Sequence, residues 1–339
     1  MTLEPVSWGV LGAANIAVKK VIPAMLQSEL SRIDAIASRS AETADDVARQ
    51  FGIPRAYSSY EALLADPAIE AVYIPLPNHL HLEWTIAAAE AGKHVLCEKP
   101  LALTSADAQR MLDACEHSNV KLMEAFMYRL HPLWQAAVNA VANGRVGELR
   151  AVQAVFSYYN DDPSNIRNNT VTGGGALYDV GCYAVNLARM LFGSEPTAVY
   201  GAIRRDSTMG TDILTSALLD FGGRHATFIC STQLEPSQRV EILGTTGRLV
   251  IDIPFNIPPD QPTRLDQIAG GDPPVAPHVD TVHIATADPY TVQADAFSHA
   301  IRINHDVPIP PTDAVANLAV IERLFAGAGG PDGARLSTP

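Results

Sequence analysis

The residue with the most distinctive chemistry is Lys99, which stands in the segment Cys97-Glu98-Lys99-Pro100. The apolar run 94–97 before it predicts a short buried strand, so the lysine follows directly on that strand. Pro100 restricts the residue before it to an extended backbone. A lysine in a partly dry crevice supplies positive charge or a proton. We therefore predict that Lys99 is catalytic and that Glu98 and Lys99 contact a cofactor. The alternative is a surface lysine in a loop.

A second reactive group follows three consecutive glycines at positions 173–175. Asp179 and Tyr183 are four residues apart, which puts both on one face of the helix predicted over 176–192. Free tyrosine has a pKa of about 10, and a nearby ammonium group lowers it. We predict that Asp179, Tyr183 and Lys99 form an acid–base group that also binds substrate. The alternative is a tyrosine half-buried in an amphipathic helix.

The turn after the first predicted strand, 7–11, is the natural place for a dinucleotide. There a strand feeds a tight turn that opens a helix, whose N–H groups face a pyrophosphate. The expected G-x-G-x-x-G appears as Gly12-x-Ala14-x-x-Ala17, with two glycines replaced by alanine. We predict cofactor contacts from five consecutive residues, namely Gly12, Ala13, Ala14, Asn15 and Ile16. The alternative is an ordinary turn between strand and helix.

The end of the second predicted strand, 33–37, indicates which dinucleotide binds. An acidic residue there would bind the ribose 2′-hydroxyl of NAD, but the sequence has Ser38, Arg39 and Ser40. A guanidinium pairs with a 2′-phosphate and the hydroxyls donate to it. Asp34 lies earlier, inside the strand, and does not take the acid's place. We predict NADP as the cofactor, the alternative being that Arg39 faces solvent.

Two further segments complete the predicted site. The third strand, 69–75, ends at Pro75 and Leu76, followed by Asn78 and His81, and loops at carboxyl ends of strands are where ligands bind. We predict that these four residues contact the cofactor; the alternative is a capping asparagine and a structural histidine. No third ligand of suitable spacing joins the histidines, so we predict no metal. Tyr158 belongs to the segment 158–172, which we expect to line the substrate pocket.

The elements that position these residues fall into two groups. Over about the first 125 residues, apolar strands alternate with helices, which is typical of a parallel sheet covered on both faces. After that, strand follows strand between 197 and 253, which favours an antiparallel or mixed sheet. The segment 254–277 is rich in Pro, Gly and Asp and is predicted to be a loop, and two helices close the chain. We expect domains at 1–124 and 125–339.

Five motifs in order resemble the glucose–fructose oxidoreductase / inositol dehydrogenase / rhizopine-catabolism (Gfo/Idh/MocA) family: WGVLGAANIA, PNHLH, CEKPLA, EAFMYRLHP and GGGALYDVGCY. The resemblance implies an α/β protein, with a Rossmann domain before an α+β domain that has a large, open, mostly antiparallel sheet. It implies catalytic roles for Lys99, Asp179 and Tyr183, and places Arg167 near the nicotinamide. Tyr183, where many relatives carry histidine, is similar to the branch of aldose and xylose dehydrogenases and sugar ketoreductases.

The resemblance therefore implies an NADP-dependent enzyme acting on a pyranose sugar or related polyol or keto-sugar. Two alternatives stay open: a dihydrodiol or other non-sugar carbonyl oxidoreductase, and a non-catalytic NADP-binding sensor. The resemblance also implies a homodimer or homotetramer formed through the second domain's sheet.

Composition excludes several other classes. The 339 residues carry a net charge of −13, which disfavours nucleic acid or an anionic membrane as a partner. The chain has no apolar run as long as a membrane span. Four separated cysteines indicate neither a disulfide framework nor a zinc site. We expect a reduced, cytoplasmic protein with a small-molecule substrate.

Overall fold

The computed structural model describes residues 3–269 and 278–327. Contacts divide the chain into two units, the first made of Met1–Leu130 with Asp288–Val315 and the second of His131–Ala287 with Ala316–Pro339. The expected domains instead assigned everything after residue 124 to the second domain. The difference is the segment Asp288–Val315, which returns to the first unit through contacts that local sequence pattern does not reveal.

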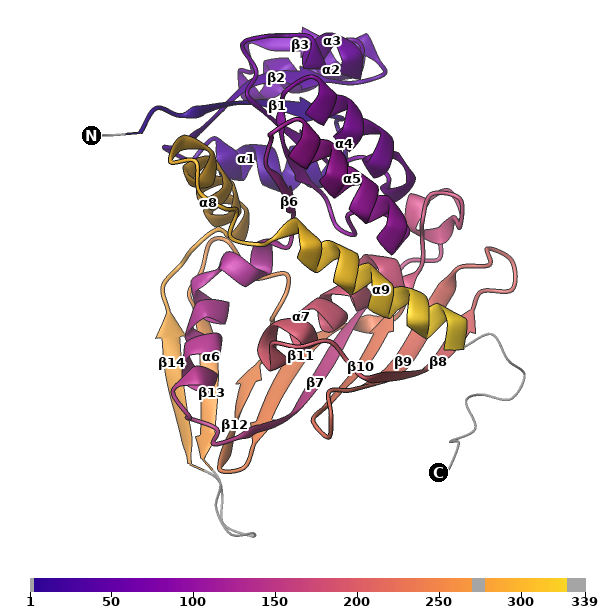
Figure 1. Cartoon of the computed structure of the whole chain (residues 1–339), viewed down its shortest axis with the longest axis vertical. Helices are drawn as coiled ribbons and strands as arrows, with labels where there is room; N and C mark the ends of the chain where they lie inside the picture. Colours follow the sequence, from indigo (N-terminus) through magenta and orange to yellow (C-terminus); the bar gives the residue numbers. More distant parts are fainter. Residues whose placement is uncertain (1–2, 270–277, 328–339) are drawn as a thin grey trace. The chain divides into compact units, whose positions relative to one another are not determined.

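The first unit contains a six-stranded parallel sheet in the order β3-β2-β1-β4-β5-β6. Figure 1 labels four of its strands, β1, β2, β3 and β6. Its strands are β1 (Val6–Leu11), β2 (Ser31–Ala37), β3 (Arg55–Tyr57), β4 (Ala71–Ile74), β5 (His94–Cys97) and β6 (Leu122–Glu124). All residues of β1 and β4 are buried, as expected of strands covered on both faces. The strand order reverses between β1 and β4, and in such sheets the crevice beyond the carboxyl ends at this point holds the ligand.

Helices alternate with these strands, which confirms the Rossmann prediction. They are η1 (Ala17–Val21), α1 (Ile22–Met25), α2 (Ala41–Phe51), α3 (Tyr60–Leu64), η2 (Asn78–Leu80), α4 (His81–Glu90), α5 (Ser105–His117), η3 (Met127–Leu130) and α8 (Pro289–Arg302). The helix predicted to follow the first turn begins with a wider π turn, η1. Strand β3 was not predicted, because its three residues are too few to show a pattern.

The returning helix α8 packs against the parallel sheet through buried side chains. The Trp8 indole Nε1 donates to Ser298 Oγ at 3.1 Å, and the ring of Trp8 lies 5.6 Å from that of Phe297. Arg302 forms two 2.6 Å hydrogen bonds to the carboxylate of Glu70. These contacts, made across about 230 to 290 residues of sequence, place α8 in the first unit.

The second unit contains an eight-stranded sheet in the order β14-β13-β12-β11-β7-β10-β9-β8. Its strands are β7 (Leu149–Tyr159), β8 (Ala198–Arg205), β9 (Asp212–Asp220), β10 (His225–Ser231), β11 (Gln233–Gly244), β12 (Gly247–Ile251), β13 (Thr263–Ala269) and β14 (Val279–Ile284). Only the β7–β10 pair is parallel among these neighbours. The mostly antiparallel sheet expected from the resemblance is confirmed.

Part of the segment 254–277, which was predicted to be a loop, is a strand. Thr263–Ala269 of this predicted loop forms β13, which pairs with β12 and β14 and buries Leu265 completely. Its Pro-, Gly- and Asp-rich composition masked a strand that depends on its neighbours for hydrogen bonds. Residues 270–277 lie outside the described part of the chain.

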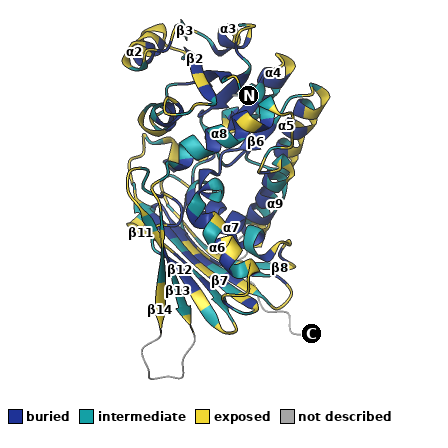
Figure 2. Cartoon of the chain, turned by 90° about the vertical axis from the view of Figure 1, so that its left-hand side faces the viewer, coloured by how far each residue is buried: buried dark blue, intermediate teal, exposed yellow. Residues whose placement is uncertain are grey.

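Helices α6 (Pro132–Ala142), α7 (Cys182–Phe192) and the later part of α9 (Pro311–Gly327) pack on the sheet. Short η4 (Ile166–Asn168) and η5 (Leu177–Gly181) precede α7. Buried and exposed residues alternate along the strands (Figure 2). Tyr200 and Ile229, which point away from the buried side, are each 40% exposed.

Candidate functional site

The turn after β1 has the backbone that a dinucleotide site requires. Gly12 has φ +115°, and a Cβ on it would lie 2.9 Å from Leu76 Cδ2, so only glycine fits without strain. Its N–H donates to the carbonyl of Ala37 at 2.8 Å. The predicted contacts Ala13, Ala14, Asn15 and Ile16 follow as partly or fully exposed residues. They lead into a helix without a side-chain cap, whose first N–H groups suit a phosphate.

The segment after β2 has hydroxyl groups and a guanidinium, as predicted. Ser40 caps α2 by accepting the Thr43 N–H at 3.2 Å, and its own N–H donates to Ser38 Oγ at 3.3 Å. Each hydroxyl can still donate its proton. Arg39 is exposed, and its charge opposes the rise that burial causes in the pKa of Tyr60.

Tyr60 was not predicted as a site residue. Its hydroxyl lies 3.8 Å from the position that a Cβ on Gly12 would take, and its ring makes an edge contact with Trp84 at 4.8 Å. The sequence around Tyr60 shows only a capping pattern, Ser58-x-x-Glu61, which predicts a helix start and no contact with Gly12, and the observed cap of α3 is Ser59. Asp34 is bonded to Ser7 and Arg32 and does not face this segment, in line with the prediction.

The loop after β4 contains the other predicted cofactor residues. Pro75 is buried and Leu76 is 8% exposed against Gly12, whereas Asn78 opens η2 and stays partly exposed. The residue that precedes α4 as its N-cap is Leu80, so the capping role considered for Asn78 is not observed.

His81 is fully buried and holds two loops together. Its ring nitrogens lie 2.8 Å from the carbonyl oxygen of Leu76 and 2.9 Å from that of Pro100. Burial lowers its pKa. Because the ring has no exposed surface, the structure corrects the predicted cofactor contact to the structural alternative.

Lys99 follows β5 in a loop fixed by buried polar groups. The Tyr73 hydroxyl donates to Glu98 Oε1 at 2.7 Å, and the Lys99 N–H donates to Glu98 Oε2 at 3.3 Å. The Lys99–Pro100 bond is cis. Burial and the charge of Glu98 raise the pKa of Tyr73. Burial also raises the pKa of Tyr290 on α8, and the charge of Lys99 opposes this. Neither tyrosine was predicted.

In the second unit, three predicted residues meet at one carboxylate. Asp179 Oδ2 accepts the Tyr158 hydroxyl at 2.5 Å and the Arg167 Nε at 3.1 Å. The Asp179 side chain is 15% exposed and that of Arg167 is 45% exposed. Tyr158 and Asp179 were both predicted to bind substrate and Arg167 to lie near the nicotinamide, but their contact could not be inferred from positions 21 and 12 residues apart. A carboxylate held by two donors is suited to orient a hydroxylated ligand.

Tyr183 lies among aromatic rings of the same unit. It is 4% exposed, with ring centroids 5.5 Å from Phe156 and 5.1 Å from Phe255. Its helix was predicted over 176–192 and is observed as η5 followed by α7, so the element is confirmed and its first turn is of π type. Wide π turns are frequent at functional sites.

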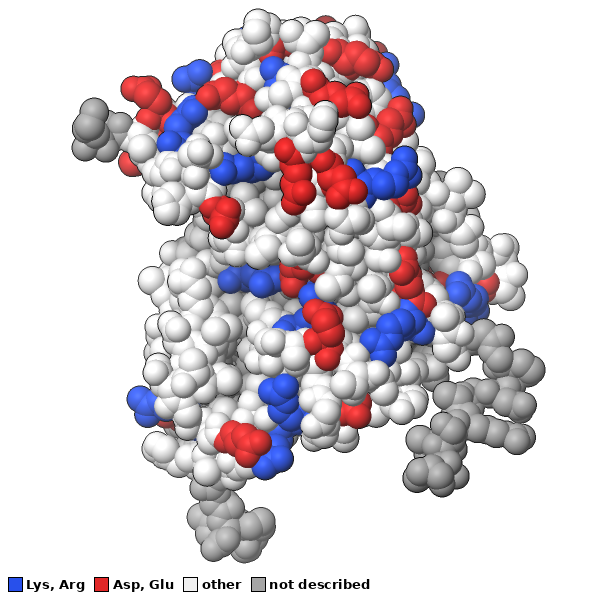
Figure 3. All heavy atoms as spheres, viewed as in Figure 1, with Lys and Arg blue, Asp and Glu red and all other residues white. Residues whose placement is uncertain are grey.

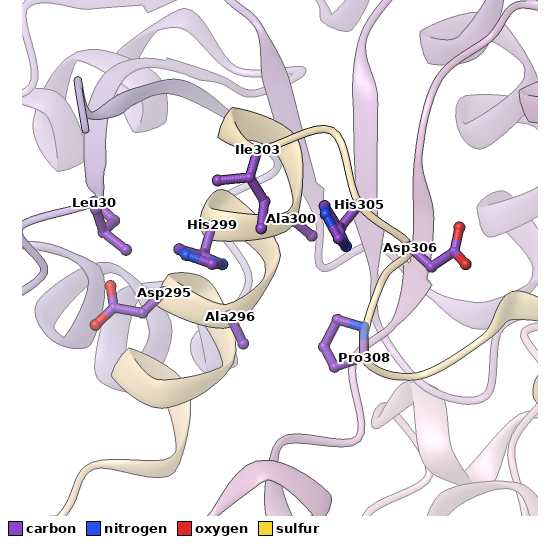
Figure 4. Close-up of a pocket in the computed structure, with 9 residues that line it drawn as sticks. All are labelled: Leu30, Asp295, Ala296, His299, Ala300, Ile303, His305, Asp306 and Pro308. Atoms are coloured by element: carbon purple, nitrogen blue, oxygen red, sulfur yellow. The ribbon is translucent and has the colours of Figure 1, made fainter. Parts of the chain in front are cut away.

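A pocket of about 410 Å³ in the first unit is lined by α8, the residues after it, and Leu30 (Figure 4). It contains His299 and His305 beside Asp295 and Asp306. Leu30 precedes β2, so this pocket lies at the amino ends of the strands, away from the edge that carries Gly12. Among the described residues no His, Cys, Asp and Glu cluster could hold a metal ion. No described helix is long and apolar enough to cross a membrane.

Comparison with protein families agrees with this architecture. Residues 6–126 match the model of an oxidoreductase family with an NAD-binding Rossmann fold. Residues 134–250 match the GFO/IDH/MocA C-terminal domain. The resemblance inferred from the five motifs is thereby confirmed.

Three similar proteins cover nearly the whole chain. An uncharacterized oxidoreductase of Rhizobium meliloti is 46% identical over 95% of this chain and 96% of its own length. A D-xylose 1-dehydrogenase (NADP⁺) of Haloferax volcanii is 39% identical over 95% and 97%. The crystal structure of KijD10, a 3-ketoreductase from Actinomadura kijaniata in complex with NADP and TDP-benzene, has a TM-score of 0.88 at 28% identity, covering 95% of this chain and 98% of that one.

Proposed function

We propose, since the chain belongs to the GFO/IDH/MocA oxidoreductase family, that it is an NADP(H)-dependent enzyme acting on a pyranose sugar or a related polyol or keto-sugar. The observation that carries the proposal is the Asp179 carboxylate, held by Tyr158 and Arg167. A buried polar group of this kind rejects ligands that leave it unpaired. Two of the three similar proteins support it, since one is named a D-xylose 1-dehydrogenase (NADP⁺) and the other a 3-ketoreductase in complex with NADP.

The residues of the first unit fit the cofactor. Gly12 takes the positive φ that the tight turn after β1 requires, and the helix after it begins without a side-chain cap. Arg39 and the hydroxyls of Ser38 and Ser40 suit a 2′-phosphate rather than a free 2′-hydroxyl. When bound, NADP(H) supplies or accepts a hydride at C4 of its nicotinamide. The dinucleotide contacts are thus assigned to Gly12–Ile16, Ser38–Ser40 and the loops after β4 and β5.

The proposed chemical roles belong to three side chains. Tyr183 takes the proton of the substrate hydroxyl during oxidation and returns it during reduction. Lys99 supplies a positive charge that favours the negatively charged oxygen formed when the proton leaves. Asp179 accepts a hydrogen bond from a neighbouring hydroxyl and so orients the ring. Glu98 and Tyr73 hold the backbone from which Lys99 extends.

We also propose a homodimer or homotetramer that forms through the outward side of the eight-stranded sheet. Tyr200 of β8 and Ile229 of β10 lie on that side. Strand β9 lies between these two strands and pairs with both. Replacing Ile229 by Glu would lower the mass measured by light scattering, whereas Glu at Leu26, 44% exposed in the first unit, would not. An unchanged mass for the Ile229 variant contradicts this assembly.

The cysteines and the surface charges support a proposal for the location and the partner of the protein. All four cysteines are free and buried, which suits the reducing cytoplasm. On the face drawn in Figure 3, Lys and Arg side chains are interspersed with Asp and Glu. We therefore propose a cytoplasmic enzyme whose partner is a small-molecule sugar or polyol.

The test follows the rise in nicotinamide absorbance when the protein is mixed with NADP⁺ or NAD⁺ and a panel of aldoses, inositols and anhydro-sugars. The reverse assay follows the loss of NADPH absorbance with keto-sugars. We expect turnover with a sugar and a preference for NADP⁺ that Arg39→Glu abolishes. Arg49→Glu, which removes an exposed arginine of α2, is the matched control. Turnover of aromatic dihydrodiols alone would favour the non-sugar alternative. Tight NADPH binding without any turnover would favour the sensor.

A further inference from the structure

Asp212 is a buried carboxylate that the roles above do not use. It is the first residue of β9 and is 1% exposed. Its Oδ2 accepts the backbone N–H of Leu177 at 2.7 Å. Leu177 begins η5, the π turn that contains Asp179 and leads into the helix of Tyr183. The carboxylate therefore meets the positive end of the helix that carries both proposed site residues.

The glycine before this helix makes room for the carboxylate. Gly175 has φ +121°, and a Cβ on it would lie 2.0 Å from Asp212 Oδ1. No side chain at position 175 is compatible with Asp212 where it stands. The same glycine donates its N–H to the carbonyl of Arg167 at 2.9 Å. Gly175, the third glycine of the triplet, therefore lies against the Asp212 carboxylate and is hydrogen-bonded to the backbone of Arg167.

The other end of η5 contacts the neighbouring strand. A Cβ on Gly181 would lie 2.8 Å from Cys230 Sγ, so this turn of helix sits directly on β10. Cys230 pairs with Thr215 of β9 in the sheet. Two adjacent strands therefore hold the two ends of a five-residue turn, with Asp179 between them.

The position of Asp212 is itself fixed by the β8–β9 hairpin. It pairs with Arg205, where β8 has a register shift, and the hairpin is closed by the Asp206 N–H donating to Thr211 O at 2.9 Å. Burial raises the pKa of Asp212, while the Leu177 N–H and the charge of Arg205 oppose that rise.

We propose that Asp212 is a positioning residue that holds the π turn Leu177–Gly181 in place and so aims the Asp179 carboxylate at Tyr158 and Arg167. Its catalytic consequence rests on the proposed function. Without the carboxylate, the Leu177 N–H loses its acceptor and the wide turn can rewind. A shift of one residue turns a helical side chain by about 100°, which would take Asp179 away from its two donors.

The experiment compares Asp212→Ala and Asp212→Asn with Asp206→Asn. Asp206 is a matched control because its carboxylate accepts two N–H groups within the same hairpin and does not contact the helix. Hydrogen exchange is read from peptides covering 177–183 and, as an internal reference, 185–192. NADPH affinity and kcat are measured on the same samples.

We expect Asp212→Ala to lose protection in 177–183 while 185–192 stays protected. We expect kcat to fall by about ten- to a hundredfold, as a small misplacement of a site residue does. NADPH affinity should change little, because the residues assigned to the phosphates and the adenine ribose, Gly12–Ile16 and Ser38–Ser40, belong to the first unit. Asp212→Asn keeps a neutral acceptor of about half the strength, so exchange should rise several-fold with a smaller loss of kcat.

The proposal is overturned if Asp212→Asn matches Asp206→Asn in both exchange and kcat. It is also overturned if Asp212→Ala loses protection equally in both peptides. If Asp212→Ala does not fold, the asparagine variant decides the question. Should the wild type turn over no sugar, the proposed function fails, but the exchange comparison still tests the positioning of the turn.

Discussion

Replacing Tyr158 by Phe removes the hydroxyl that donates a hydrogen bond to the Asp179 carboxylate. The Tyr158 hydroxyl lies 2.5 Å from Asp179 Oδ2, whereas Arg167 Nε lies 3.1 Å from the same oxygen. The phenylalanine ring keeps the aromatic volume at the end of β7. The change therefore affects the orientation of the carboxylate with little change in packing.

The size of the effect follows from the chemistry of that hydrogen bond. A hydrogen bond to a charged group is worth about 1.5–3 kcal/mol. Since about 1.4 kcal/mol is a factor of ten, kcat/KM for the sugar should fall by about ten- to a hundredfold. The Arg167 pair does not compensate, because its side chain is 45% exposed and exposed ion pairs contribute little.

The assay is initial-rate kinetics with saturating NADP⁺ and varied sugar, alongside NADPH binding by fluorescence. Tyr159→Phe is the matched control, because that neighbouring tyrosine is 61% exposed and bonds only to Asp161 on the surface in the described structure. NADPH affinity should be unchanged in both variants. If the two variants have the same kcat/KM, or if NADPH affinity falls with it, Asp179 is not oriented by Tyr158 for substrate binding.

Three further predictions concern the first unit. Gly12→Ala should raise the Kd for NADPH by about five- to a hundredfold, because backbone strain of this kind costs about 1–3 kcal/mol and the new Cβ meets Leu76; an unchanged Kd in fluorescence titration would contradict it. His94 Nδ1 accepts a backbone N–H at 2.9 Å, and burial, then the charge of Lys121, lowers its pKa from 6.5 to about 4. The unfolded chain therefore takes up a proton first as pH falls, so stability should be lost between pH 6.5 and about 4, by up to about 3 kcal/mol. Urea unfolding at a series of pH values should show that His94→Asn removes this loss of stability. If the unfolding free energy of wild type and variant falls equally with pH, His94 is not its cause. Phe297→Ala should cost the first unit about 3–5 kcal/mol; no loss in thermal unfolding would contradict the packing of α8 on Trp8.

The sequence predicted well those features that depend on local pattern. Buried parallel strands are continuous apolar runs, so β1, β4 and β5 and the loops at their carboxyl ends could be located. The residues after those strands, from Gly12 to Lys99, were predicted as cofactor contacts because ligands of such sheets bind at that edge. The replacement of an acid by Ser38 and Arg39 was equally local.

Features that depend on distant partners could not be predicted. The contact of Tyr158 and Arg167 with Asp179 and the bond from Leu177 to Asp212 join separate elements. His81 showed the same limit, because its type and place suited a ligand contact and only its burial revealed a structural part. Strand β13 was missed because it is stabilised by hydrogen bonds to its neighbouring strands, while its composition resembles that of a loop.

Single-turnover hydride transfer in the Tyr183→Phe variant tests the central claim most directly. Enzyme preincubated with NADP⁺ is mixed with the best sugar of the panel, and nicotinamide reduction is followed in wild type and variant. We predict a rate lowered by about 10²–10⁴, the contribution of general acid–base catalysis, with NADP⁺ affinity unchanged. A variant that reduces NADP⁺ at the wild-type rate would contradict the assignment of Tyr183 as the proton-transfer residue.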